Sequence, residues 1–114
     1  MWVTKYALKN KGGDLIEKTP DQMHKRLAKE FARIEKSFGG DRSLSEKKIY
    51  NFLKDFKYIV PQGSPMMGIG NDHVNVSLSN CVVVESPKDN VSSIMDSGKE
   101  LANLFKRRCG VGLD

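Results

Sequence analysis

The chain has 114 residues, of which 39% are hydrophobic and 29% charged, a composition typical of one small globular domain with a modest core. It contains no apolar run of about 18 residues and no apolar N-terminal segment, which argues against a membrane span and a secretory signal and favours a cytoplasmic protein. The net charge of +5 would suit a polyanionic partner, but Lys and Arg are interleaved with acidic residues along the whole chain, so nucleic acid is not the expected partner.

The first predicted helix covers residues 19–38. Thr19 and Gln22 form a capping box around Pro20, which suits the first helical position. Apolar residues then recur at the spacing expected for one buried face, at Met23, Leu27, Phe31, Ile34 and Phe38. A pair of glycines follows, and it is expected to end the helix.

A second capping box, at Ser43 and Glu46, predicts a second amphipathic helix. Its apolar residues are Ile49, Phe52, Leu53 and Phe56. Residues 19–57 are therefore expected to form a helical hairpin. Its charged faces could be solvated surface or could bind a ligand or nucleic acid, and we favour solvated surface because an amphipathic stripe usually marks a packed core.

Residues 74–85 are predicted to form a strand. Even positions from Val74 to Val84 are apolar apart from Asn80, whereas most odd positions are polar and Cys81 is among them. The β-branched residues and the flanking loops predict a buried central strand. We expect its polar face, which carries Cys81, to border a site.

A third helix is predicted after this strand, with Asp89 or Asn90 as its N-cap. Its apolar side is formed by Val91, Ile94, Met95, Leu101, Leu104 and Phe105, and a Gly-Val-Gly segment is expected to end it. No second strand is predicted. Residues 1–18, residues 57–60 or another polypeptide would then have to complete the sheet, because a single strand leaves its backbone groups unpaired.

No metal site is predicted, because His24 and His73 stand alone and neither cysteine has a CxxC or Cys/His neighbourhood. The glycines form no known phosphate-binding motif. A lone strand cysteine such as Cys81 is most often a small buried hydrophobe. A generic thiol oxidoreductase would need a resolving cysteine or an electropositive helix N-terminus beside it, and the sequence shows neither.

Three stretches, taken in order, resemble the N-terminal third of ribonucleotide reductase large subunits, most closely the adenosylcobalamin-dependent branch. They are VPQGSPMMGIGN from Val60, VSLSNCVVVESPKDN from Val76 and FKRRCGVGLD from Phe105. Upstream, TPDQMHKRLAKEFARIEK and IYNFLKDFKYIVP resemble the helical region before the catalytic barrel of that family. The resemblance implies an α/β fold, with a mainly helical region over residues 1–60 and the first β/α unit of a ten-stranded α/β barrel, incomplete in this chain, over residues 61–114.

The resemblance also implies a catalytic site. Cys81 matches the family's first active-site cysteine, which donates reducing equivalents as the ribose loses its 2′-hydroxyl and becomes half of a disulfide. The residues implied to contact the substrate are Ser79, Asn80, Cys109 and Gly110. In the family the redox partner of the first cysteine lies far downstream, so we interpret Cys109 as part of the pocket lining and not as that partner.

The resemblance further implies an effector, a cofactor and a partner. Asp89, Asn90 and Val91 match the segment that binds a deoxynucleotide effector, although Asp89 and Asn90 would serve equally as helix caps. The radical source would be adenosylcobalamin or, alternatively, a metal-bearing partner subunit. The family's remaining active-site cysteines have no counterpart here, so we expect a split subunit or gene fragment that is inactive until a complementary chain supplies the rest of the barrel and binds the ribonucleotide with it.

An alternative function is a nonenzymatic basic module that binds nucleic acid or regulates a reductase. Nucleic-acid binders expose aromatic side chains among basic ones. The five phenylalanines of this chain fall on predicted apolar faces instead, which favours the reductase.

Overall fold

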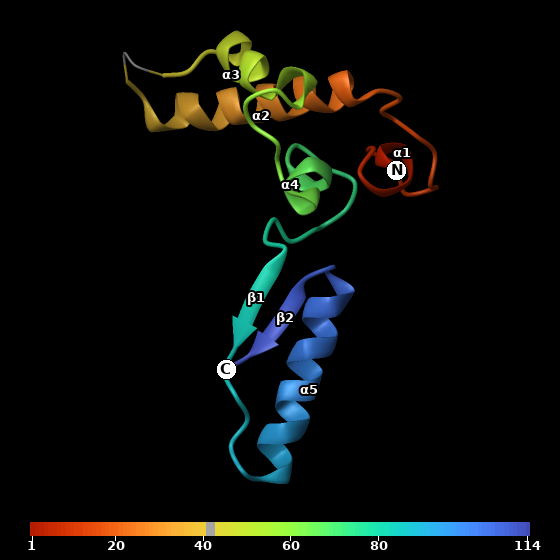
Figure 1. Ribbon diagram of the computed structural model, residues 1–114, viewed down its shortest axis with the longest axis vertical. Coiled ribbons are helices and arrows are strands. Elements are labelled where there is room, and N and C mark those ends of the chain that lie inside the picture. Colours follow the sequence, from red (N-terminus) through yellow and green to blue (C-terminus); the bar gives the residue numbers. More distant parts are fainter. Residues whose placement is uncertain (41–42) are drawn as a thin grey trace. The chain divides into compact units, whose positions relative to one another are not determined.

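The computed structural model describes residues 1–40 and 43–114. Two compact units make up the chain, Met1–Asn75 and Val76–Asp114. The first contains α1 (Trp2–Lys5), α2 (Pro20–Phe38), α3 (Glu46–Leu53), the 3-10 helix η1 (Lys54–Phe56) and α4 (Gly63–Gly68). The second contains β1 (Cys81–Val84), α5 (Val91–Lys106) and β2 (Gly110–Leu113) (Figure 1). The mainly helical N-terminal region is confirmed, and no helix in the described ranges is long and apolar enough to cross a membrane.

Helix α2 begins and ends where the sequence predicts. The Thr19 hydroxyl accepts a hydrogen bond from the Gln22 amide at 3.4 Å, and Gly39 ends the helix with φ of 64°, a value that suits glycine. The predicted start of the second helix is wrong by two positions. Ser45, not Ser43, is its N-cap, because the Ser43 hydroxyl donates instead to the carbonyl of Gly40 at 2.9 Å.

The core of the helical unit lies between α2 and α3. Its centre is formed by Met23, Leu27 and Leu53, with Trp2, Ile49, Met66 and Ile69 packed around them. The predicted burial of the whole apolar stripe of α2 is wrong, since Phe31 and Ile34 are partly exposed and Phe38 is 81% exposed. Helix α3 has 8 residues and α2 has 19, so α3 is too short, at about 12 Å, to cover a helix of about 28 Å.

A buried ion pair joins three segments of the helical unit. Glu17, which is 5% exposed, accepts hydrogen bonds from the Leu8 amide at 3.2 Å and from Nε of Arg26 at 2.5 Å. The same guanidinium donates to the carbonyl of Met66 at 2.6 Å and to that of Ile69. The loop before α2, the helix itself and the end of α4 are therefore fixed to one another by a single side chain.

Helix α4 and helix α1 were not predicted. The α4 sequence, GSPMMG, is short and has glycine at both ends, so its pattern resembled a loop. A Cβ atom placed on Gly63 would lie 2.7 Å from Cε1 of Tyr6. The first turn of α4 can therefore approach the ring of Tyr6 only because residue 63 has no side chain.

The second unit is a β-α-β unit, which corrects the prediction of a single strand. β1 and β2 are parallel, and residues 81–84 pair in register with residues 110–113; Figure 1 shows α5 alongside them. The Gly-Val-Gly segment that was expected only to end the helix forms β2. β1 is also shorter than predicted, because β2 offers only four residues for pairing.

The alternation predicted for the strand is present within β1, but the prediction of a buried central strand is wrong. Val82 and Val84 are the more buried residues of β1, whereas Cys81 and Val83 are exposed. The predicted N-cap of α5 is confirmed, because the Asn90 side chain accepts from the Ser93 amide at 2.9 Å. The expected buried side of α5 is wrong, since none of its residues is buried; a two-stranded sheet is too narrow to cover such a helix.

The first prediction concerns the buried ion pair. Replacing Arg26 by Leu leaves the Glu17 carboxylate buried and unpaired, and we expect the free energy of unfolding to fall by about 3 kcal/mol. The measurement is urea unfolding followed by the fluorescence of Trp2, the only tryptophan of the chain. The control is Arg33→Leu, which removes an ion pair with Glu30 whose arginine side chain is 68% exposed, and we expect its midpoint to match that of the wild type. Equal effects of the two substitutions would contradict the structural role of Arg26.

The second prediction concerns Gly63. Gly63→Ala places a methyl group against the Tyr6 ring, and we expect a loss of about 1–3 kcal/mol, as for other overpacked sites. In a Tyr6→Ala background the same substitution should cost much less, because the clashing atoms are absent. A double-mutant cycle measured by the same unfolding assay gives the coupling energy between positions 6 and 63. A coupling energy near zero would show that the Tyr6 ring is not the reason for glycine at position 63.

Candidate functional site

Five predicted site residues lie together at the amino end of the two strands. Cys81 begins β1 and Gly110 begins β2, and the two are directly paired. The Gly110 amide donates to the carbonyl of Asn80 at 2.7 Å, and the thiol of Cys109 lies 3.5 Å from the carbonyl oxygen of Ser79. The structure thus brings together the predicted catalytic residue and the four predicted substrate-contacting residues.

The two thiols of this site are in different environments. Cys81 is exposed, whereas Cys109 is 4% exposed, and both are free. A Cβ atom on Gly110 would lie 3.9 Å from the sulfur of Cys81, so these two residues share one face of the sheet. Cys109 precedes β2, and its sulfur lies against the Ser79 carbonyl. The two cysteines do not form a disulfide with each other.

A serine turn shapes the entry to β1. The Ser79 amide donates to the Ser77 hydroxyl at 3.2 Å, and the Ser79 hydroxyl donates to the carbonyl of Cys81 at 3.0 Å. Such side-chain bonds to nearby backbone compete with a regular strand, which is why β1 begins only at Cys81. The predicted role of Ser79 did not include this turn, and the Ser-Leu-Ser spacing was the signal for it.

The three predicted effector residues are separated from this site. Asp89, Asn90 and Val91 precede or begin α5, whereas Cys109 follows its last turn, and a helix of 16 residues is about 24 Å long. The Asn90 side chain is used as the N-cap. Asp89 and Val91 are exposed, Val91 by 77%.

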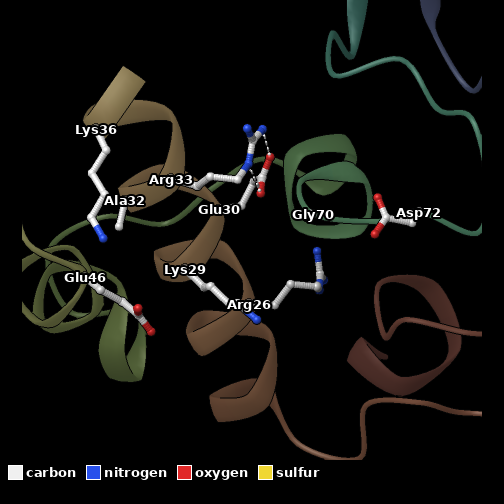
Figure 2. A pocket seen from close by; sticks show the side chains of 9 residues that line it. All are labelled: Arg26, Lys29, Glu30, Ala32, Arg33, Lys36, Glu46, Gly70 and Asp72. Carbon is white, nitrogen blue, oxygen red and sulfur yellow. Dashed lines mark hydrogen bonds and ion pairs between the residues drawn. The ribbon is translucent and has the colours of Figure 1, made fainter. Parts of the chain in front are cut away.

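A charged cleft of about 560 Å³ lies in the helical unit (Figure 2). Its charged lining residues are Arg26, Lys29, Glu30, Arg33, Lys36, Glu46 and Asp72. The Arg33 guanidinium hydrogen-bonds to Glu30 at 2.6 Å and lowers the pKa of that carboxyl, and Arg26 is held by Glu17. Four basic and three acidic side chains line the cleft, so its charges nearly balance and it does not form a selective anion site.

Within the described ranges, no group of three or more His, Cys, Asp or Glu side chains is arranged to hold a metal ion. His24 is buried in the helical unit, and His73 is exposed.

Comparison with known families identifies the helical unit. A family model described as the all-alpha domain of ribonucleotide reductase matches residues 1–73. The chain belongs to the ribonucleotide reductase large-subunit family. The matched range corresponds to the N-terminal portion of such a reductase and nearly coincides with the unit Met1–Asn75. No curated protein matches the chain.

Ribonucleotide reductases are oxidoreductases of deoxyribonucleotide synthesis, and the family match places this chain in that context. The match does not extend to Cys81 or Cys109. The family match therefore assigns no role to the β-α-β unit that carries both cysteines.

The third prediction concerns the reactivity of the thiols. Because Cys81 is exposed and Cys109 is buried, an alkylating reagent should modify Cys81 much faster in the folded chain. Peptide mass analysis over a time course measures both rates in one sample, and the same reaction in concentrated urea is the control in which the rates should converge. Equal rates in the folded chain would show that Cys109 is not shielded.

Proposed function

We propose that this reductase chain supplies Cys81 as one of two thiols that reduce the ribose of a ribonucleoside diphosphate or triphosphate by radical chemistry. In the overall reaction the C2′–OH bond breaks, the oxygen leaves as water and a C2′–H bond forms. Two thiols give up two electrons and two protons and become a disulfide. The observation that carries this proposal is the exposed Cys81 thiol, set at the start of β1 among Ser79, Asn80 and Gly110.

The surroundings of Cys81 suit a substrate that approaches its sulfur. Gly110 lies on the same face and has no side chain, so the space beside the sulfur stays open. The Gly110 amide donates a hydrogen bond to the Asn80 carbonyl. The Ser79 hydroxyl donates a hydrogen bond to the Cys81 carbonyl. The backbone at both strand starts is thus already bonded, which holds the thiol in position before a substrate binds.

The second thiol and the rest of the catalytic barrel belong, in this proposal, to a complementary polypeptide. Two features support it: among the residues that the structure describes, β1 and β2 pair only with each other, and α5 has no buried residue. Parallel sheets are normally large and covered on both faces, so these strands gain stability from further strands and from cover over α5. The β-α-β unit would then be the first unit of the ten-stranded barrel, and the chain alone would be inactive.

Adenosylcobalamin is the radical source in this proposal, with a metal-bearing partner subunit as the alternative, and when bound either would supply the radical that starts the reaction. The described residues offer no cluster of metal ligands, so they do not fit as a site for a metal centre. Asp89, Asn90 and Val91 are proposed to contact a deoxynucleotide effector. Exposure of Asp89 and Val91 at the start of α5 supports that role.

The fourth prediction tests this function. The tagged chain is purified from its native source together with the proteins that bind it. Ribonucleotide reduction is then measured for the wild type and for Cys81→Ser. We expect the assembly to form deoxyribonucleotide and the serine variant to lose at least about a thousandfold in rate, because a hydroxyl cannot form the disulfide. Lys99→Ala, an exposed change on α5, is the matched control and should keep full activity.

The outcomes separate the two parts of the proposal. Activity that survives Cys81→Ser would remove Cys81 from the reaction. A chain that is active without any companion would instead contradict the complementary polypeptide.

A further inference from the structure

His24 is a buried titratable side chain that the proposed reaction does not use. It lies on α2, is 1% exposed, and its Nε2 atom has no hydrogen-bond partner within residues 1–40 and 43–114. Buried polar atoms in folded proteins are nearly always hydrogen-bonded. An imidazole in such a place is tolerated while it is neutral and becomes unfavourable once it carries a charge.

The ring of Phe56 covers His24. The two ring centroids are 4.5 Å apart, and the planes meet at 74°, an edge-to-face contact. Phe56 belongs to η1, where Asp55 and Phe56 have φ values of 57° and 55°. Residues other than glycine rarely adopt this left-handed conformation, and they keep it only where surrounding contacts enforce it. The contact with His24 is one that holds this strained turn against α2.

Charged groups around the imidazole act in opposite directions. Asp21 on α2 and Asp55 on η1 favour the protonated form, but burial outweighs them and lowers the pKa of His24 below its usual 6.5. Asp21 is already engaged, since it accepts from the Tyr50 hydroxyl of α3 at 2.5 Å and pairs with Lys25 at 2.8 Å. It is therefore not available as a full counter-charge.

We propose that protonation of His24 releases η1 from α2 and opens the apolar groove between α2 and α3. Seven apolar residues line this groove and would become more accessible, among them Phe31, Ile34, Leu44, Phe52 and Ile59. The groove is already partly open on one side, where Phe31 and Ile34 are partly exposed. This device belongs to the helical unit and does not depend on the proposed role of Cys81.

The sign of the pH dependence follows from linkage. A folded-state pKa below the unfolded value means that the open state binds more protons. The stabilisation by neutral His24 is thus fully present above about pH 6.5 and is lost as the pH falls below that value towards the folded-state pKa.

The fifth prediction tests this device by hydrogen exchange on the whole chain. The Ile59 amide donates to the Phe52 carbonyl at 3.0 Å and closes the segment that contains η1. Between pH 7.5 and pH 5, its protection relative to the intrinsic exchange rate should fall by roughly tenfold. The Ile94 amide in α5, which donates to the Asn90 carbonyl, should keep its protection.

Two variants separate His24 from the other histidine. His24→Leu removes the titrating group and should abolish the change at Ile59, whereas His73→Gln, in an exposed loop, should leave it intact. Should His24→Leu fail to fold, an NMR titration of the wild type decides, with a midpoint for His24 below the usual histidine value of 6.5 expected. A midpoint of His24 at or above that value, or protection of Ile59 that does not depend on pH, would overturn the proposal.

Discussion

The Arg26 guanidinium is the group on which the helical unit depends most. Its partners come from the segment before α2 and from the end of α4, so one side chain determines how the chain enters and leaves the α2–α3 hairpin. A buried pair of this kind contributes little net stability compared with apolar packing, but its geometry tolerates few alternatives. Apolar contacts around Met23 and Leu27 supply the driving force, and the ion pair selects one arrangement among those they would allow.

The β-α-β unit has the opposite character. Its strands are well defined by pairing, yet its helix buries nothing and its sheet has only two strands. Within this unit, the strands leave most of the apolar surface of α5 without cover. The two units therefore differ in how they are stabilised. The helical unit has its own small core, whereas the β-α-β unit lacks one and positions Cys81 at the start of β1.

The sequence predicted the features that depend on local chemistry. Thr19 and Asn90 were identified as caps because a hydroxyl or amide next to a helix start has one favoured use. The grouping of Ser79, Cys81 and Gly110 was anticipated only through the family resemblance. β2 was missed because a Gly-Val-Gly segment carries no strand signal of its own and becomes a strand only by pairing with β1.

Burial was predicted least well, since it depends on the lengths of neighbouring elements. The apolar stripe of α2 is correct as a pattern, but α3 begins only at Glu46 and is too short to cover Phe38 as well. His24 was dismissed as isolated, and nothing in its sequence neighbourhood indicates that Phe56 would cover it. The partners of Arg26 come from segments with no helical or strand period, so no pattern in the sequence points to them.

The different exposure of the two cysteines determines what happens when the chain meets an oxidant. The exposed sulfur of Cys81 is the one that peroxide would reach, and its first product is a sulfenic acid. Redox-sensing cysteines often lie next to a resolving thiol, which converts that product into a disulfide before it is oxidised further. Cys109 is buried, so it is shielded from this role. In the proposed assembly the resolving thiol would come from the complementary polypeptide, and the chain without its companion would be the form that overoxidation damages.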